Sequence, residues 1–236
     1  MDVKLLGTIL GVWAHPDDEA YLSAGVMAMA ARASSRVVCV TATRGELGSP
    51  DVERWPLETL PAVREKEMAA SLDVLGVREH HWLGYPDGAC AHIPETNAVS
   101  RLVEIMDDVR PDTVLTFGPD GMTGHLDHQT VCDWTTKAFC EAAPPGGRLF
   151  YATKTAEFDD RFASLPLHRQ AFGEGPPRTP ESDTDLAFRL DDDILDLKVA
   201  ALRAQVSQVT LLRDAMGADV YRDWVADEWF VLGATA

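Results

Sequence analysis

The sequence predicts a doubly wound α/β fold, in which a mostly parallel sheet carries helices on both faces. Two apolar runs of strand length, Thr8–Ala14 and Val37–Ala42, are near-continuous rather than alternating. Continuous apolarity is typical of strands that are buried on both faces, as in a parallel sheet covered by helices. The stretch between the two runs has helical character, so the chain opens in the order strand, helix, strand.

Further elements continue this alternation along the chain. Apolar runs predict strands at Thr113–Phe117, Leu149–Ala152 and Leu186–Leu190. Helical spacing and helix-ending residues predict helices at Val63–Leu75, Val99–Val109, Val131–Ala142 and Ile194–Leu212. Gly76 is a C-cap for the first of these helices, and Pro111 ends the second because proline disfavours a helical residue before it. The alternation predicts a Rossmann-like architecture, and a length of 236 residues suits one domain over positions 1–236.

Positions 172–185 interrupt the regular pattern. This stretch is rich in glycine, proline and acidic residues and shows no apolar periodicity. A segment of this length without structure of its own is typical of a functional loop. We expect a mobile loop beside the active site rather than a linker between domains.

Composition and charge exclude several classes of function. The chain carries 38 Asp and Glu against 21 Lys and Arg, a formal charge of −17, which repels nucleic acid and anionic membranes. No stretch approaches the roughly 18 uninterrupted apolar residues of a membrane span, and no signal cleavage site is recognisable, so we expect a cytoplasmic protein. The cysteines show no CxxC spacing and are expected to be mostly free thiols: Cys39, Cys90, Cys132 and Cys140. The sequence leaves a homo-oligomer open.

Polar residues gather directly after the first predicted strand. His15, Asp17 and Asp18 lie within four residues of one another at the carboxyl end of that strand, where open α/β sheets bind their ligands. Proline and acidic residues also suit the first turn of a helix, because carboxylates stabilise the positive end of the helix dipole. That structural interpretation does not account for the imidazole beside the carboxylates.

A second cluster follows the predicted strand Thr113–Phe117. It contains His125, Asp127 and His128, and it projects from the same edge of the sheet as the first cluster. Catalytic zinc sites use three protein ligands of nitrogen or oxygen and leave one position open. Two histidines and one carboxylate drawn from the two clusters satisfy that rule.

The two clusters together resemble the hallmarks of the LmbE-like or PIG-L-type de-N-acetylases, an AHPDDE loop and a later HxDH. The resemblance extends through segments that span nearly the whole chain: Thr43-Arg44-Gly45-Glu46, Arg64 and Glu67, Leu75-Gly76-Val77, Asp87-Gly88, and Lys198 through Ser207-Gln208. The resemblance implies that His15, Asp18 and His128 bind Zn²⁺ and that Asp17 is the general base. It further implies that a protonated His125 stabilises the oxyanion and that Asp127 orients that imidazole.

The resemblance also implies a substrate, an N-acetylated amino sugar or sugar conjugate, with Glu46, Arg64 and Asp87 as contacts. An arginine and two acids are as often a solvated surface or an ion pair, and the identity of the acyl acceptor and the length of the acyl chain stay open. Two departures matter. Members acting on mycothiol precursors have a tyrosine where this chain has Thr123, and Gln205 replaces a histidine found in some members, which disfavours mycothiol biosynthesis.

Other functions compete with this interpretation. A metal-dependent phosphoesterase could use the same histidines and carboxylates, although few carboxylates surround the second cluster. A nucleotide-binding module would also suit a doubly wound sheet, but the first turn lacks GxGxxG and offers carboxylates where a pyrophosphate needs backbone donors. A non-catalytic zinc site is disfavoured because Asp17 and His125 are both intact. The remaining histidines have no spacing that joins either cluster and are interpreted as structural: His80, His81, His92 and His168.

Overall fold

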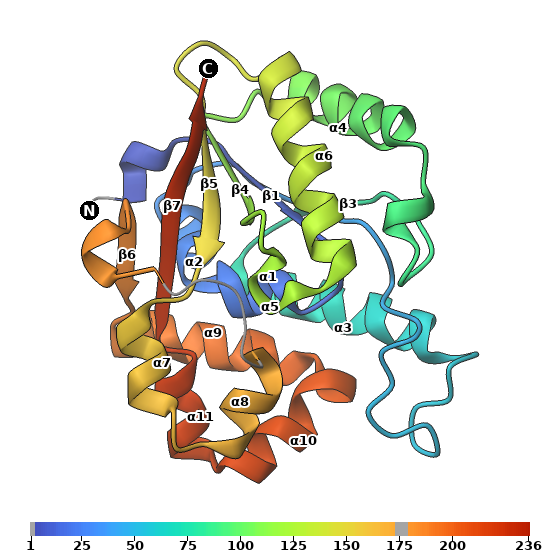
Figure 1. Ribbon diagram of the computed structural model, residues 1–236, viewed down its shortest axis with the longest axis vertical. Helices are drawn as coiled ribbons and strands as arrows, with labels where there is room; N and C mark the ends of the chain where they lie inside the picture. Colours follow the sequence, from blue (N-terminus) through green and yellow to red (C-terminus); the bar gives the residue numbers. More distant parts are fainter. Residues whose placement is uncertain (1–2, 173–178) are drawn as a thin grey trace.

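The computed structural model describes residues 3–172 and 179–236, and within them seven strands form one sheet of order β3-β2-β1-β4-β5-β7-β6 (Figure 1). The strands are β1 (Ile9–Trp13), β2 (Val37–Thr41), β3 (Glu79–Trp82), β4 (Thr113–Phe117), β5 (Arg148–Thr153), β6 (Leu186–Arg189) and β7 (Asp227–Thr235). Strands β1 to β5 pair in parallel, whereas β7 pairs antiparallel with both β5 and β6. The predicted mostly parallel sheet is confirmed.

Helices cover both faces of this sheet. They are α1 (Asp18–Leu22), α2 (Ala24–Arg32), α3 (Leu60–Leu75), α4 (Glu95–Val109), α5 (Gly121–Gly124), α6 (Leu126–Ala142), α7 (Ala156–Phe162), α8 (Pro166–Phe172), α9 (Asp192–Ala204), α10 (Val206–Met216) and α11 (Ala218–Trp224). Short 3-10 turns are η1 (Val3–Leu6), η2 (Cys90–His92) and η3 (Glu181–Asp183). Helices α4 and α6 pack together over one face, and α2, α3 and α9 pack together over the other (Figure 1). The predicted doubly wound architecture is therefore confirmed.

The central strands form the core. Every residue of β1, β2 and β4 is buried, which explains their continuous apolar sequences. Trp13 on β1 and Phe117 on β4 meet edge to face, with ring centroids 5.1 Å apart. Complete burial of side chains of this kind contributes roughly 1.5–3 kcal/mol each, so these strands give the site a rigid floor.

The chain reverses its direction of winding between β1 and β4. Strand β1 has β2 on one side and β4 on the other, and α4 returns the chain from β3 across the sheet to β4. In such sheets a crevice opens at this switch point, outside the carboxyl ends of the two strands. The loops after β1 and β4 carry the two polar clusters of the sequence, and this topology brings them together.

The structure corrects several predicted boundaries. The predicted helix Ile194–Leu212 is divided at Gln205, where the backbone leaves the helical region (φ −89°, ψ 59°). Helix α6 begins at Leu126, five residues before the predicted start, and β7 was not predicted. Of the predicted loop at 172–185, positions 173–178 lie outside the described residues.

Two sequence-based expectations concern the whole chain. Among the described helices, no segment is both long and apolar enough to cross a membrane. All four cysteines are free thiols, and three of them are buried, in agreement with the predicted core role.

Candidate metal centre and active site

The loop after β1 bends sharply at Asp17. Its backbone has φ 104°, a left-handed conformation that is unfavourable for a residue with a side chain. The Asp17 amide donates a hydrogen bond to Glu19 Oε2 at 3.0 Å, and the Asp17 carboxylate does not cap helix α1. The turn thus presents His15 and Asp18 at the sheet edge and leaves the Asp17 carboxylate free for chemistry.

The second cluster begins helix α6. His125 is the N-cap residue, and its Nδ1 accepts a hydrogen bond of 3.2 Å from the Asp127 amide. Asp127 and His128 follow in the first turn and are both buried. The positive φ of Gly121 and Gly124 lets the chain turn twice between β4 and this helix.

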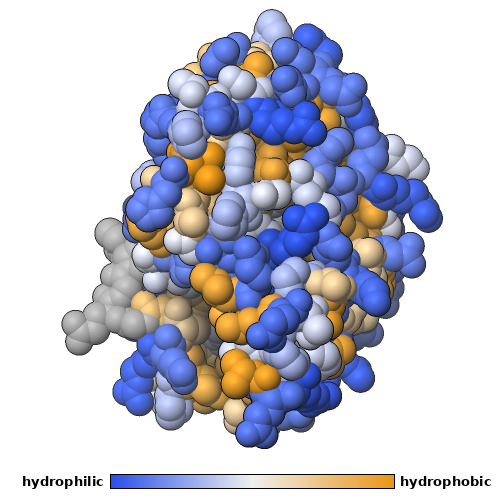
Figure 2. All heavy atoms as spheres, turned by 90° about the vertical axis from the view of Figure 1, so that its right-hand side faces the viewer, coloured by the Kyte–Doolittle hydropathy of each residue, from blue (hydrophilic) through white to orange (hydrophobic). Residues whose placement is uncertain are grey.

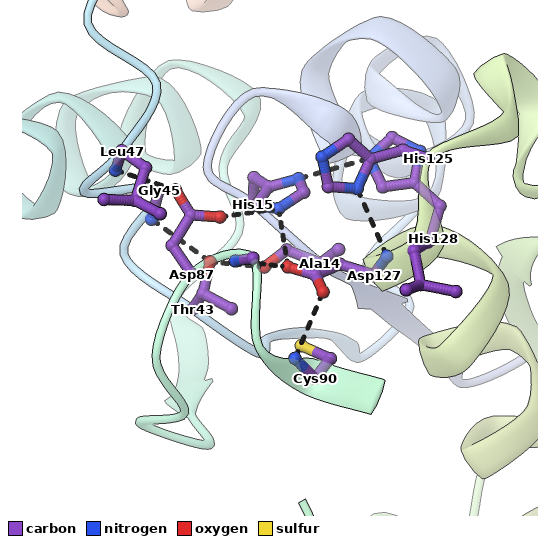
Figure 3. A network of polar contacts seen from close by, with 12 residues as sticks. Ala14, His15, Thr43, Gly45, Leu47, Asp87, Cys90, His125, Asp127 and His128 are labelled. Carbon is purple, nitrogen blue, oxygen red and sulfur yellow. Dashed lines mark hydrogen bonds and ion pairs between the residues drawn. The ribbon is translucent and has the colours of Figure 1, made fainter. Parts of the chain in front are cut away.

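The three predicted metal ligands lie together between the two clusters (Figure 3 shows both histidines). His15 Nδ1 is 3.1 Å from His128 Nε2. The Asp18 carboxylate reaches both rings, with Oδ2 at 3.5 Å from His15 Nδ1 and Oδ1 at 3.4 Å from His128 Nε2. One cation between these atoms would bind two nitrogens and one oxygen, the donor set that was predicted.

The other nitrogen of each ring supports this assignment. His128 Nδ1 lies 2.9 Å from the Gly121 carbonyl, which only accepts hydrogen bonds, so Nδ1 carries the proton and Nε2 keeps its lone pair. His15 Nε2 lies 3.1 Å from Asp87 Oδ1 and 3.4 Å from Asp127 Oδ2, which likewise assigns its proton to Nε2. A bound metal ion would therefore meet His15 Nδ1 and His128 Nε2 beside the Asp18 carboxylate, and this arrangement of donors fits a metal ion.

The charges around these atoms favour a cation as well. Burial lowers the pKa of His15, but hydrogen bonds to Asp127, Asp18 and Asp87 outweigh it and raise the pKa well above its ordinary value. Burial raises the pKa of Asp18, yet His128 and His15 bring it down to about 2. The acidic side chain stays ionised and the site favours positive charge, which a divalent ion would supply.

Asp17 lies beside this group and contacts Arg64. Burial raises the pKa of Asp17 to about 7, against the opposing effect of the Arg64 guanidinium, whose Nη2 is 3.6 Å from Asp17 Oδ1. Arg64 is 3% exposed, donates from Nη1 to the Gly45 carbonyl at 2.8 Å, and donates from Nη2 to the Pro16 carbonyl. These hydrogen bonds of Arg64 hold the Asp17 loop in place. Contact between Arg64 and the substrate stays a prediction.

Asp127 has a different partner from the one predicted. Its carboxylate accepts hydrogen bonds from the amides of Gly88 at 2.8 Å and Cys90 at 3.1 Å, and it contacts His15 Nε2. With His125, the contact is through the Asp127 backbone amide. In this structure the Asp127 carboxylate thus contacts the ring of His15, and the orientation of His125 by Asp127 stays a prediction.

The ring of His125 lies beside the rings of His15 and His128. Its centroid is 4.9 Å from those of His15 and His128, and its side chain is exposed. Because Nδ1 accepts the Asp127 amide proton, this conformation requires an unprotonated Nδ1 and a protonated Nε2. In this conformation Nε2–H is the one donor of the ring, and the protonated form implied by the resemblance, which would lack this cap bond, stays a prediction.

Glu46 and Asp87 form a polar wall from the loops after β2 and β3. Glu46 Oε1 accepts the Asp87 amide at 2.9 Å, and Asp87 Oδ2 accepts the Leu47 amide at 2.9 Å. Glu46 Oε2 is buried and accepts no hydrogen bond from any residue that the structure describes, so it is a ready acceptor for a hydroxyl group. Substrate contact by both residues stays a prediction.

A buried network behind Asp17 was not assigned from the sequence. Glu19 is fully buried, burial raises its pKa to about 8, and its Oε1 accepts a hydrogen bond of 2.8 Å from Gln205 Nε2. Glu67 accepts two hydrogen bonds from Ser207, through the amide at 2.8 Å and the hydroxyl at 2.6 Å. The sequence did contain a signal for this network, because Glu67 of α3 and Ser207 of α10 both belong to the segments that carry the family resemblance.

Two of the histidines that were interpreted as structural, His80 and His168, make contacts far from the proposed metal ligands in sequence. His80 Nε2 lies 3.0 Å from Thr41 Oγ1 on the neighbouring strand. His168 Nδ1 accepts a hydrogen bond of 3.1 Å from Trp224 Nε1, and its Nε2 lies 3.2 Å from Asp159. These contacts support the interpretation made from their spacing.

Comparison with known proteins agrees with the geometry. The sequence profile of the PIG-L family, described as GlcNAc-PI de-N-acetylase, matches residues 10–139. The chain belongs to this family. This PIG-L member is 33% identical to a 1D-myo-inositol 2-acetamido-2-deoxy-alpha-D-glucopyranoside deacetylase of Kineococcus radiotolerans, over 88% of this chain and 70% of the relative. It is 30% identical to the protein of the same name in Mycolicibacterium smegmatis, over 95% of this chain and 89% of the relative.

The PIG-L member also resembles solved structures. A triple mutant of a deacetylase of the teicoplanin biosynthetic pathway superposes with a TM-score of 0.69, at 20% sequence identity, over 96% of this chain and 98% of that chain. This likeness confirms the fold over nearly the full length, including the C-terminal helices that the family profile does not reach.

Proposed function

We propose that this PIG-L member is a zinc-dependent hydrolase that removes the acetyl group from the amide nitrogen of an N-acetylated amino sugar conjugate. The observation that carries the proposal is the donor set of His15, Asp18 and His128, with the Asp17 carboxylate beside it and free of any helix-capping bond. The names of the curated relatives support the substrate class, since both act on an acetamido sugar joined to inositol.

Asp17 is the proposed general base. Zinc held by the three ligands would polarise the amide carbonyl and lower the pKa of a water molecule towards about 7. Asp17 accepts the proton of the attacking water, and Arg64 at 3.6 Å favours the ionised form that this step requires. The left-handed turn at Asp17 holds the carboxylate in position before the substrate binds.

After the attack of water, His125 stabilises the oxyanion and Asp17 protonates the departing amine. The Nε2–H of neutral His125 donates a hydrogen bond to the developing oxyanion, and donors of this kind contribute about 3 kcal/mol. If His125 gave up that proton it would become an imidazolate, which is strongly unfavourable. Asp17 therefore returns the proton to the departing amine, and the products are acetate and a free amino sugar.

The polar wall of Glu46 and Asp87 is the proposed contact for sugar hydroxyls. Both lie in loops at the carboxyl ends of β2 and β3, and Asp87 Oδ1 lies 3.1 Å from Nε2 of the proposed ligand His15. Family members that act on mycothiol precursors are expected to have a tyrosine where this chain has Thr123. The proposal therefore extends to N-acetylated amino sugar conjugates in general rather than to one inositol conjugate.

Amine release from a set of N-acetylated amino sugars, with and without zinc, tests the proposal. N-acetylglucosamine, its inositol conjugate and two other glycosides should release stoichiometric acetate and amine only when zinc is bound. A phosphodiester and a phosphomonoester serve as competing substrates. Two metals per chain, phosphoester turnover and no amine from any sugar would contradict the proposal and favour a phosphoesterase.

A further inference from the structure

A cavity of about 220 Å³ opens from the metal ligands towards the C-terminal helices. Asp18 and His128 belong to its lining, and so do Met122 and Thr123 of α5. Beyond them the walls are mainly aliphatic and aromatic: Tyr21, Leu22, Phe158, Leu212, Trp224 and Trp229. Apolar side chains also gather where the surface is hollowed in the lower half of Figure 2. The proposed reaction with an acetyl group gives this space no occupant.

The charged residues of the lining are already paired. Lys154 forms an ion pair with Asp159, and its ammonium lies 5.3 Å from the centre of the Phe172 ring. Glu228 forms a 2.8 Å ion pair with Lys198, and Asp227 forms one of 2.6 Å with Arg189. What remains for a ligand is therefore apolar surface, which a sugar could enter only with unsatisfied hydroxyl groups.

The two sides of the metal ligands differ in chemistry. Glu46 and Asp87 supply polar atoms from the loops after β2 and β3, whereas the cavity is lined from α1, α5, β5, β7 and the C-terminal helices. When the amide carbonyl of a substrate lies at Asp18 and His128, two groups extend from it, the amine part and the acyl chain. The polar side suits the sugar, so the apolar side is left for the acyl chain.

We infer that this enzyme hydrolyses amides of straight acyl chains longer than acetyl, with the chain bound in this cavity. The inference rests on the proposed function and names the acyl group of the same reaction. An apolar cavity of about 150 Å³ holds benzene, so 220 Å³ suits a chain of about six to eight carbons. Water adds to the carbonyl carbon and the carbon–nitrogen bond breaks, which releases a fatty acid and the free amine.

A chain-length series on one amine tests the inference. N-acyl glucosamines with acyl chains of two, four, six, eight and twelve carbons would be compared by amine release with the zinc-loaded protein. Each buried methylene is worth about fourfold. We therefore expect kcat/KM to rise at least about tenfold from acetyl to hexanoyl, and to fall at dodecanoyl once the cavity is filled. A steady fall from acetyl onwards would overturn the inference and leave the proposed deacetylase intact.

A second arm separates the acyl chain from an apolar aglycone. Octyl N-acetylglucosaminide carries its apolar chain on the sugar, and it should gain less than about threefold over N-acetylglucosamine. A gain equal to that of the N-octanoyl substrate would assign the cavity to the aglycone and overturn the inference. No amine from any N-acyl amine, acetyl included, would overturn the proposed function and the inference with it.

Two neighbouring leucines of α10 provide a matched pair of variants. Leu212 lines the cavity, whereas Leu211 is 52% exposed. Leu212→Trp should lower the hexanoyl-to-acetyl ratio of kcat/KM at least about tenfold, because the indole occupies the space of the chain. Leu211→Trp should leave this ratio within twofold. Equal ratios in the two variants would overturn the placement of the chain, and the series on the unaltered protein is decisive if either variant misfolds.

Discussion

Asp127 ties the second polar cluster to the first through His15. Its carboxylate accepts two backbone amides and faces His15 Nε2, so it assigns the lone pair of His15 Nδ1 to the metal side. Partners of this kind make a ligand more basic and fix its orientation. We therefore expect Asp127, which the resemblance assigned to the oxyanion step, to act on the affinity for the metal.

This role predicts the effect of Asp127→Asn. The amide of asparagine keeps the shape but removes the charge that faces His15, so zinc affinity should fall by about 10- to 100-fold. Competition with a fluorescent zinc chelator measures the change. If zinc affinity were unaltered while kcat alone fell, Asp127 would serve His125, as expected from the sequence.

The residues of the candidate metal centre could be named from the sequence, whereas their pairings could not. Chemically distinctive side chains after two buried strands marked the two clusters, and the family resemblance then assigned the metal to His15, Asp18 and His128. Which ring Asp127 contacts depends on the turn after β3 that places the amides of Gly88 and Cys90, and no local pattern in the sequence encodes that turn. The N-cap bond of His125 was not predicted either, since it depends on the turn that precedes helix α6.

At the level of elements, the best-predicted strand is β4. It covers Thr113–Phe117 as expected, because a run buried on both faces has an unambiguous apolar pattern. The break between α9 and α10 carries no glycine or proline, so helical spacing predicted one continuous helix. Tertiary hydrogen bonds from Gln205 to Glu19 and from Ser207 to Glu67 accompany the break, and they act between segments far apart in sequence.

An ion pair inside the fold joins three elements. Glu228 of β7 contacts Lys198 of α9 at 2.8 Å and accepts the amides of Gly25 and Val26 at the start of α2. Both charged side chains are fully buried. Removing one charge leaves the other uncompensated in a medium of low polarity, which destabilises strongly.

Glu228→Gln should therefore lower the free energy of unfolding by about 3–5 kcal/mol. Urea denaturation followed by tryptophan fluorescence measures the loss. Arg101→Gln is the matched control, because the pair of Arg101 with Glu104 is solvent-exposed and should hardly change the midpoint. Equal midpoints for the two variants would contradict the importance of the buried pair.

His80 makes strand β3 sensitive to acid. Burial, with a smaller effect of His81, lowers the pKa of His80 to about 4, while the unfolded chain has an ordinary histidine pKa near 6.5. The unfolded state therefore binds the proton first as the pH falls. The contribution of His80 to stability is complete above about pH 6.5 and is lost between about pH 6.5 and 4.

Replacement by Asn should remove this part of the acid sensitivity. Between pH 7 and 4.5, the unfolding free energy of His80→Asn should fall less steeply than that of the unaltered protein, as measured by urea titrations at several pH values. His92→Asn, at an exposed position, should keep the original slope. Parallel curves for all three proteins would show that His80 does not titrate in this window.

At the scale of the molecule, the sheet order decides where chemistry occurs. The winding reverses between β1 and β4, and the loops after these strands supply all three proposed metal ligands. A chain with a formal charge of −17 concentrates several carboxylates at this point, including Asp18, Asp87 and Asp127. Without a cation these charges repel one another, so metal binding should stabilise the whole fold.

Metal removal should lower the melting temperature by about 5–10 °C. Free zinc at about 100 times its dissociation constant stabilises by about 2.7 kcal/mol, and one kcal/mol corresponds to about 2–4 °C in a chain of this size. Thermal scans with zinc and with a chelator measure the difference. The scans of His128→Ala should coincide under the two conditions, and a shift of normal size in that variant would place the metal elsewhere.

Asp17 is the proposed base beside a metal held by His15, Asp18 and His128, and a variant at Asp17 separates this role from metal binding. Asp17→Asn should retain one zinc per chain while turnover of an N-acetylated amino sugar falls by about 10²- to 10⁴-fold, the usual contribution of a general base. Zinc content and amine release would be measured on the same sample. Turnover at the original rate, with zinc bound, would exclude Asp17 as the base.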